Sequence, residues 1–392
     1  MNGTLNVDAI VERVHRRIAE DDVQPSPEAL VSVVREEAGV ISDLDMLELL
    51  RRLRHDSDGV GALEPLLAIP GVTDVVVNGP GAVFFDRGRG LERARLSFPS
   101  DADVRRLAVR LAHACGRRLD DAQPFADGRL NRDDGSHIRV HAMLSPPAEN
   151  GTCLSLRVLH QAADTLDSLV GAGTMPKDIA SALGLIVRAR RAFLVTGGTG
   201  SGKTTLLSAL LAEVPHDERI ICIEDTAELQ PRHPHVLTLV ARAKNIEDRG
   251  EITLSDLLKQ SLRMRPDRII IGEIRGAEVV DLLAALNTGH DGGAGTVHAN
   301  SLAEIPARME ALAALGGLDR TAVHSQVAAA LQVVLVMKRH AEGRRLHQIG
   351  LLEGNPVRAR VLWDEIHGET PEFRSYLREL REQLGLVEGE TP

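Results

Sequence analysis

One stretch near the middle of the chain constrains the fold more than any other: Gly197-Gly198-Thr199-Gly200-Ser201-Gly202-Lys203-Thr204. It fits the pattern G-x-x-x-x-G-K-[ST], follows the short apolar segment 193–195 and precedes a helical pattern from Thr205 to Glu213. Glycines in this setting let the backbone curl so that several N–H groups point at one phosphate, and the helix dipole adds to that attraction. The stretch therefore predicts a strand, a phosphate-binding loop and a helix, in that order.

The chemistry of this loop indicates a nucleotide. The ammonium group of Lys203 can reach the β- and γ-phosphates, and the Thr204 hydroxyl can bind Mg²⁺. We therefore expect the nucleotide to contact every residue of the loop and the first residues of the helix, namely Gly197, Gly198, Thr199, Gly200, Ser201, Gly202, Lys203, Thr204 and Thr205.

Two acidic residues follow apolar segments downstream of the loop. Glu273 ends the segment Arg268-Ile269-Ile270-Ile271-Gly272-Glu273. Glu224 ends the segment 219–224, and Asp225 follows it directly. In parallel α/β sheets, ligands collect at the carboxyl ends of strands, so both carboxylates are expected near the phosphates. Two alternatives without a catalytic role remain. Glu273 could merely cap a loop, and Glu224 with Asp225 could belong to a solvated acidic turn.

A glycine-rich stretch from Thr288 to Asn300 contains two histidines. His298 follows a short apolar segment and is a candidate contact for the γ-phosphate. His290 is interpreted as a structural residue.

The hydrophobic pattern changes along the chain and divides it into five parts. Residues 1–62 have helical spacing and predict a helical bundle, and residues 63–160 predict a small α+β domain. Residues 161–176 form a predicted linker. In residues 177–363, helices alternate with short apolar strands, which predicts an α/β domain with a parallel sheet. Residues 364–392 predict a C-terminal helix and tail.

Composition narrows the classes of function. The 46 basic and 56 acidic residues give a net charge of 46 − 56 = −10, and aromatic residues make up only 2% of the chain. Broad nucleic-acid binding is disfavoured, because it requires basic surfaces and aromatic stacking platforms. Three widely spaced cysteines, no signal-peptide pattern and no apolar run of membrane-spanning length predict a cytoplasmic protein without membrane insertion.

Together these motifs resemble the four signatures of the secretion-superfamily ATPases, which drive type II secretion, type IV pili and type IV secretion. The signatures are a Walker A loop, an acidic "Asp box", a Walker B strand and a "His box", here at residues 197–204, 223–229, 268–273 and 289–300. The phrases 265–268, 272–278 and 287–290, with 76–80 and 116–120 in the preceding domain, look most like the CpaF-type ATPases of tight-adherence (Flp) pili.

The resemblance implies a RecA-like fold for the C-terminal domain, a PAS-like fold for the α+β domain, and ATP and Mg²⁺ as cofactors. Glu224 would orient or deprotonate the attacking water, Glu273 would hold the Mg²⁺ shell or share that task, and His298 would be the His-box histidine. Arginines of the preceding domain would reach the γ-phosphate. Arg139 and Arg157 match those positions, and Arg129 is a weaker candidate.

The resemblance further implies a homohexameric ATPase, recruited to the inner face of the membrane by an integral membrane platform protein, that powers assembly of a Tad/Flp-type pilus or type II/IV secretion. Two alternatives stay open at this point. One is a conjugation-type or nucleic-acid-associated motor, and the other is a nucleotide-gated assembly scaffold with little turnover.

Overall fold

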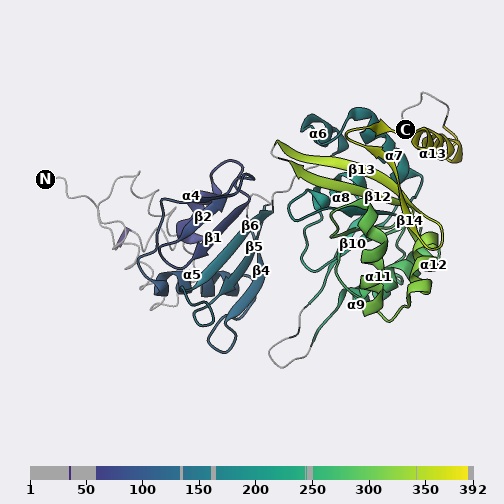
Figure 1. Cartoon of the computed structure of the whole chain (residues 1–392). Helices are drawn as coiled ribbons and strands as arrows, with labels where there is room; N and C mark the ends of the chain where they lie inside the picture. The colour runs from purple at the N-terminus through teal and green to yellow at the C-terminus, as the bar shows by residue number, and fades with distance from the viewer. Residues whose placement is uncertain are drawn as a thin grey trace. The chain divides into compact units, whose positions relative to one another are not determined.

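The computed structural model describes residues 35–36, 59–132, 136–159, 165–242, 244, 250–340 and 342–386. The chain forms two compact units that divide between Gln161 and Ala162 (Figure 1). Most of the predicted helical bundle of residues 1–62 lies outside the described residues.

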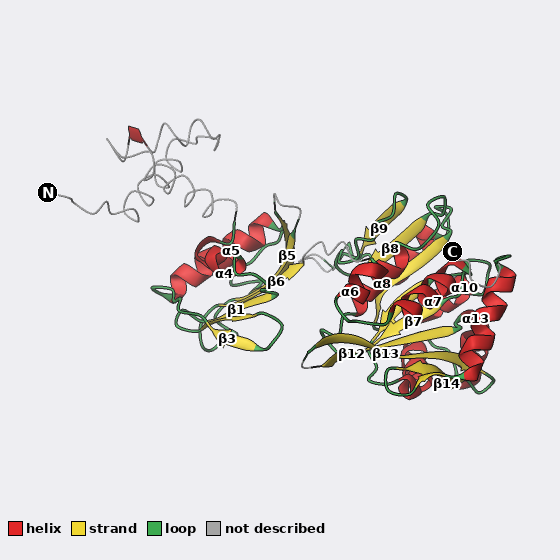
Figure 2. Ribbon diagram, turned by 90° about the horizontal axis from the view of Figure 1, so that it is seen from above, coloured by secondary structure: helices red, strands yellow, loops and turns green. Residues whose placement is uncertain are grey.

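The first unit is an antiparallel sheet with its helices on one side (Figure 2). Its six strands follow the spatial order β3-β2-β1-β6-β5-β4. The elements in chain order are η1 Gly61–Leu63, α4 Glu64–Leu67, β1 Asp74–Asn78, β2 Val83–Asp86, β3 Leu91–Arg93, α5 Asp101–Ala114, β4 Phe125–Asn131, β5 His137–Met143 and β6 Cys153–Leu159.

Strict alternation in the strands explains why this sheet has one covered face. In β5 the residues Ile138, Val140 and Ala142 are buried, and the residues between them are partly exposed. The buried face packs against α5, whose apolar positions recur at helical spacing as Val104, Leu107, Ala108 and Leu111. The prediction of an α+β domain is confirmed.

The second unit is a nine-stranded mixed sheet between helices, in the spatial order β15-β14-β13-β12-β7-β11-β10-β8-β9. Its elements up to the middle are α6 Leu166–Gly171, α7 Lys177–Arg188, β7 Phe193–Thr196, α8 Lys203–Leu211, β8 Ile220–Glu224, β9 Val236–Val240, α9 Leu254–Ser261 and β10 Arg268–Ile274. The remainder are α10 Glu278–Leu286, β11 Ala294–Val297, η2 Leu302–Glu304, α11 Ile305–Leu315, α12 Arg320–Ala330, β12 Val333–His340, β13 Gly343–Glu353, β14 Arg358–Asp364, β15 Gly368–Glu369 and α13 Pro371–Gln383.

Both faces of this sheet are covered at its centre, where every residue of β7, β8 and β11 is buried. Alternate residues of the strands enter different cores: Phe193 and Val195 pack with α6, α7, α8 and α13, whereas Leu194 packs with α9 to α12. All five residues of β8 are buried. This is the pattern of a central parallel strand, and the predicted parallel α/β core with its RecA-like arrangement is confirmed.

Strand order places the chemistry-bearing loops side by side. The parallel neighbours of β7 are β11 on one side and β12 on the other, and β10 pairs with β11 and β8. The carboxyl ends of β7, β11, β10 and β8 therefore meet at one edge of the sheet. The phosphate-loop signature and His298 directly follow β7 and β11, Glu224 is the last residue of β8, and Glu273 is the last residue but one of β10.

The boundaries of the second unit differ from the predicted ones. The predicted linker 161–176 contains α6, whose Leu166 and Leu169 are buried in the core. At the other end, β14 crosses the predicted limit at 363, and α13 buries Phe373 and Leu380 completely. The glycine-rich composition of residues 161–176 favoured a linker over a helix, so α6 was not predicted. The amphipathic pattern of α13 predicted a helix but not that its apolar face packs on this unit.

The sheet is also not purely parallel. Strands β13, β14 and β15 extend it in antiparallel fashion beyond β12. Among the helices that the structure describes, none has the length and apolar character needed to cross a membrane.

Candidate nucleotide site

The loop between β7 and α8 has the backbone that its glycines predict. Gly197, Gly200 and Gly202 have φ values of +147°, +70° and +95°, and Gly202 is the left-handed residue from which α8 starts. L-residues with side chains rarely adopt such angles. The loop therefore turns back on itself and presents the first N–H groups of α8, which have no partner within the helix, toward one point.

A neighbouring strand leaves no room for a side chain at the start of this loop. A Cβ atom on Gly197 would lie 2.3 Å from the carbonyl oxygen of Met337 in β12 and 2.6 Å from Oγ of Ser201. The residues present thus fit a bound triphosphate: a cradle of main-chain amides that only glycine can form, with one lysine behind it.

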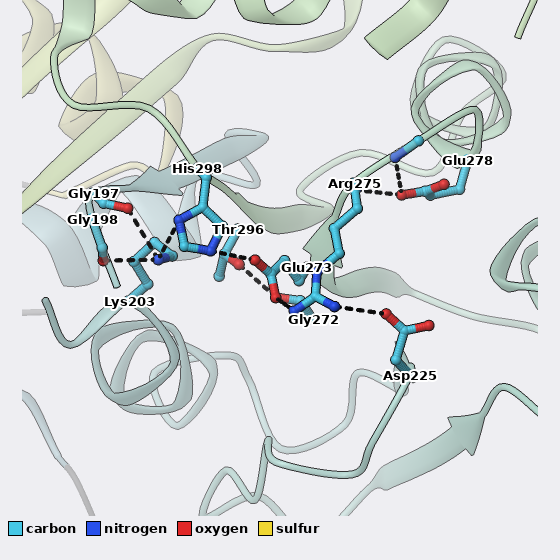
Figure 3. Close-up of polar contacts among 11 residues, drawn as sticks. Gly197, Gly198, Lys203, Asp225, Gly272, Glu273, Arg275, Glu278, Thr296 and His298 are labelled. Atoms are coloured by element: carbon cyan, nitrogen blue, oxygen red, sulfur yellow. Dashed lines mark hydrogen bonds and ion pairs between the residues drawn. The ribbon is translucent and has the colours of Figure 1, made fainter. Parts of the chain in front are cut away.

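Lys203 lies within the loop and is almost completely buried. Its Nζ donates to the carbonyl oxygens of Gly197 at 3.0 Å and Gly198 at 3.1 Å and lies 3.5 Å from Nδ1 of His298 (Figure 3). Burial lowers the pKa of Lys203, and the charge of Glu273 opposes that shift.

His298 links the lysine to the Walker B carboxylate. Its Nε2 lies 2.5 Å from Oε1 of Glu273, on the side of the ring opposite Lys203 (Figure 3). An ammonium group has no lone pair to accept a proton, so Nδ1 must be the acceptor and the neutral ring carries its proton on Nε2, facing Glu273. Burial and then the charge of Lys203 lower the pKa of His298, which favours this neutral form.

Glu273 also binds Arg275, which directly follows the end of β10. Burial by itself would raise the pKa of Glu273, but the hydrogen bond and charge of Arg275, with the charges of His298 and Lys203, bring the pKa below its usual range. Arg275 Nη2 donates to Oε2 of Glu273, and its Nη1 lies 3.8 Å from Oδ2 of Asp225. Lys203, His298, Glu273, Arg275 and Asp225 thus form one continuous chain of charged and polar contacts (Figure 3).

Glu224 is 3% exposed and holds the acidic turn in place. Its Oε2 accepts hydrogen bonds from the backbone N–H groups of Glu228 at 2.9 Å and Leu229 at 3.0 Å. Gly272 makes room for it, since a Cβ atom there would lie only 2.7 Å from Cγ of Glu224. The side chain of Glu224 on β8 therefore lies against Gly272 on the adjacent strand β10, the residue before Glu273.

Three residues of this site went unassigned in the sequence analysis. Arg275 directly follows β10, two residues after Glu273, and this close spacing could have revealed it. Gly272 was quoted only as part of a phrase. Thr296 donates from Oγ1 to the carbonyl oxygen of Gly272 at 2.6 Å and ties β11 to the Walker B strand, and nothing in its sequence context indicated that role.

The other predicted residues of the second unit are placed as follows. Gly198, Thr199 and Gly200 are exposed at the loop surface, and Thr204 and Thr205 are partly exposed in the first turn of α8. His290 lies 3.2 Å through Nδ1 from the carbonyl oxygen of Ala285 at the end of α10, in keeping with its structural interpretation. Among the described residues, no cluster of three or more His, Cys, Asp or Glu could hold a metal ion.

The predicted arginines of the first unit lie in a single row across its sheet. Arg139 pairs with Arg129 on β4 and with Arg157 on β6, and Arg157 pairs with Asp74 on β1. All four lie on the face that α5 does not cover. Nε of Arg157 donates to Oδ1 of Asp74 at 2.8 Å.

A comparison with known protein families identifies the family of this chain. The family model of type II/IV secretion system proteins matches residues 56–349. This chain belongs to that family. The resemblance seen in the four motifs is confirmed at the family level.

Individual relatives and structures agree. A putative conjugal transfer protein of Mycobacterium tuberculosis is 56% identical over 335 residues, which is 84% of this chain and 95% of that protein. The conjugal transfer protein TrbB of Rhizobium radiobacter is 32% identical over 287 residues, 72% of this chain and 84% of that protein. The pilus retraction motor PilT, solved with bound ADP, shares the fold with a TM-score of 0.55 at 21% identity, covering 84% of this chain and 90% of that chain.

Proposed function

We propose that this chain hydrolyses ATP with Mg²⁺ and that the hydrolysis cycle powers a type II/IV secretion machine. The observation that carries the proposal is the contact chain at the edge of the sheet: Lys203 in the phosphate loop, His298, and the deprotonated carboxylate of Glu273. This contact chain joins an ammonium group, a neutral imidazole and a carboxylate. Such a set of groups can bind a γ-phosphate and change its internal contacts when that phosphate is lost.

Each residue has a role within this proposal. The amides of residues 197–205 and the Lys203 ammonium bind the phosphates. Thr204 and Glu273 would hold Mg²⁺, which neutralises developing phosphate charge when bound. Glu224 is buried and accepts hydrogen bonds from two backbone amides. It would orient or deprotonate the attacking water, a task that Glu273 could share.

His298 has a bridging role in the proposal. With its proton on Nε2 toward Glu273, its Nδ1 is the acceptor that faces Lys203. Any ligand that draws the Lys203 ammonium away changes the His298 contact and, through it, Glu273. The site can therefore report phosphate occupancy to β10 and to Arg275.

The arginines of the first unit also have a role in the proposal. Arg139 and Arg157 would contact the γ-phosphate and stabilise charge in the transition state, with Arg129 beside them. This assignment is supported by the resemblance of their strand positions to family members. Contacts that exist only with the γ-phosphate present give the two nucleotide states different affinities for a closed form, which is the requirement for a motor.

The finer identity of the machine is also a proposal. The CpaF-like phrases favour a homohexamer that works in the cytoplasm, at the inner face of the membrane, on a platform protein of a Tad/Flp-type pilus. The names of the mycobacterial and rhizobial relatives favour a second candidate, a conjugal transfer system. The acidic balance of the chain favours action on protein partners over direct contact with DNA.

Phosphate release by purified protein with ATP and Mg²⁺ tests the proposal. Lys203→Ala should lower turnover by at least about 100-fold, because a charge-assisted phosphate contact is lost at a preorganised site. Calorimetric titration with ATP should show binding to the unaltered chain. Undiminished turnover in the Lys203→Ala variant, or no heat of ATP binding to folded wild-type protein, would refute the assignment.

A further inference from the structure

The hairpin of β12 and β13 packs directly against the phosphate loop. The carbonyl oxygen of Met337 contacts Gly197, as described above, and the Met337 Cε atom would lie 3.4 Å from a Cβ on Gly202. Met337 pairs with Leu346 across the hairpin, and both are buried in the core. Two positions nearer the hairpin tip, on the same face as this pair, Arg339 pairs with Arg344.

Both arginines reach the loop glycines. A Cβ on Gly202 would lie 3.0 Å from Cδ of Arg344 and 3.6 Å from its Cβ, and a Cβ on Gly200 would lie 3.5 Å from Nη1 of Arg339. The stem of Arg344 therefore lies against the residue from which α8 starts. Arg344 is exposed, and its guanidinium makes no hydrogen bond or ion pair with any residue that the structure describes.

Strand order says which end of the nucleotide these arginines face. Lys203 contacts His298, which follows β11, and through it Glu273 on β10, so the γ-phosphate side of the loop faces β11 and β10. The β12–β13 hairpin lies on the other side of β7. A polyphosphate bound along the loop must therefore have its α- and β-phosphates nearer the hairpin.

We propose that Arg344, with Arg339 beside it, binds the α- and β-phosphates of the nucleotide and is a specificity-determining residue for the diphosphate portion. The planar guanidinium fork matches two phosphate oxygens at once, which a lysine cannot do. The contact would add to the backbone cradle a cation that is present for ATP and ADP alike. This inference rests on the proposed function of the loop.

The test is calorimetric binding of ADP and ATP, with Mg²⁺, to full-length wild-type protein and three variants. Arg344→Ala should weaken both nucleotides by a similar factor of about tenfold, in the range of one charge-assisted hydrogen bond at a partly exposed site. Arg344→Lys should recover part of the loss. The salt dependence of binding should be shallower in Arg344→Ala, because one cation no longer contacts the phosphates.

Arg345→Ala is the matched control. Arg345 is the next residue on the same strand, points to the opposite face, and pairs with Glu342 at 3.0 Å with both side chains exposed. It carries the same charge one residue further from the hairpin tip, so a general electrostatic effect would appear in both variants. Arg345→Ala should bind both nucleotides as the wild type does.

The outcomes separate this inference from the proposed function. Unchanged ADP affinity in Arg344→Ala, a loss confined to ATP, or an equal loss in Arg345→Ala would each overturn the role of Arg344 while the nucleotide site stands. A lower thermal midpoint in Arg344→Ala with no recovery in Arg344→Lys would mark a structural role and overturn it too. Wild-type protein that binds neither nucleotide would overturn both.

Discussion

Arg139 in the first unit and Glu273 in the second are both charged residues on strands. They differ in where along the strand a charged side chain is accommodated. Arg139 lies in the middle of β5, where every second residue faces away from the core. Glu273 is the last residue but one of β10, after four buried residues. A sheet covered on one face can carry charge anywhere along its open side, whereas a sheet covered on both faces leaves polar groups only at strand ends.

The comparison has a functional consequence. Glu224 and Glu273 of the second unit lie at or near the carboxyl ends of their strands, and Arg275, His298 and Lys203 hold the pKa of Glu273 below its usual range. The arginines of the first unit form a row in the open, with exposed or partly exposed side chains. The second unit therefore has charged groups that contact one another at strand ends, whereas the first unit has a row of charged residues on an uncovered sheet face.

The largest expected effect comes from removing that surface. Arg139→Ala combined with Arg157→Ala should lower ATP turnover by about 1,000-fold, the lower range for arginine fingers, with little change in the thermal midpoint. His141→Ala is the control, since His141 lies on the same face and strand and pairs with Asp127 at 3.0 Å. A phosphate-release rate in the double variant equal to that of the wild type would contradict the proposed contact of Arg139 and Arg157 with the γ-phosphate.

An intermediate effect is expected at the strand edge of the second unit. Gly272→Ala places a methyl group 2.7 Å from Cγ of Glu224, and that carboxylate is buried and cannot move freely. The variant should lose about 1–3 kcal/mol of unfolding free energy in denaturant titrations, the usual cost of overpacking.

Gly81 provides the matched control in the first unit, since a Cβ there would meet nothing within 4 Å. Gly81→Ala should leave the unfolding free energy within about 0.5 kcal/mol of wild type. If the two alanine variants were equally stable, the close packing of Glu224 against β10 would not constrain the site.

The smallest effect concerns pH. The pKa of His298 is below its ordinary value of 6.5, because burial and the Lys203 charge disfavour the protonated ring. The unfolded chain then binds more protons than the folded one below that pH, so stability should fall as pH decreases from 7 toward 5. Because the side chain is 40% exposed, the loss should stay below about 1 kcal/mol.

The measurement is a set of denaturant titrations across that pH range for wild type and His298→Gln. The chain has 15 histidines, so only the difference between the two proteins reports on this ring. The variant should show the shallower pH dependence. An identical slope in both proteins would contradict the neutral, lysine-facing form of His298.

Much of the parallel core was predictable, because its strands are apolar on both faces and its loop signature is specific. Ile220–Glu224 and Arg268–Ile274 are strands where the apolar runs predicted them. The antiparallel extension was not predictable from periodicity, since β13 mixes the exposed residues 343–345 with a buried end.

What the sequence alone determined is the chemistry of the loop and the identity of its carboxylates, since glycine conformations and the lysine position are local properties of 197–204. The tertiary structure alone decided which partners those groups meet. The proton position on His298, the contact of Arg275 with Asp225, and the placement of Arg344 on Gly202 all arise where strands far apart in sequence end at one edge. No local pattern encodes such meetings, because they follow from strand order and from which side chains burial leaves room for.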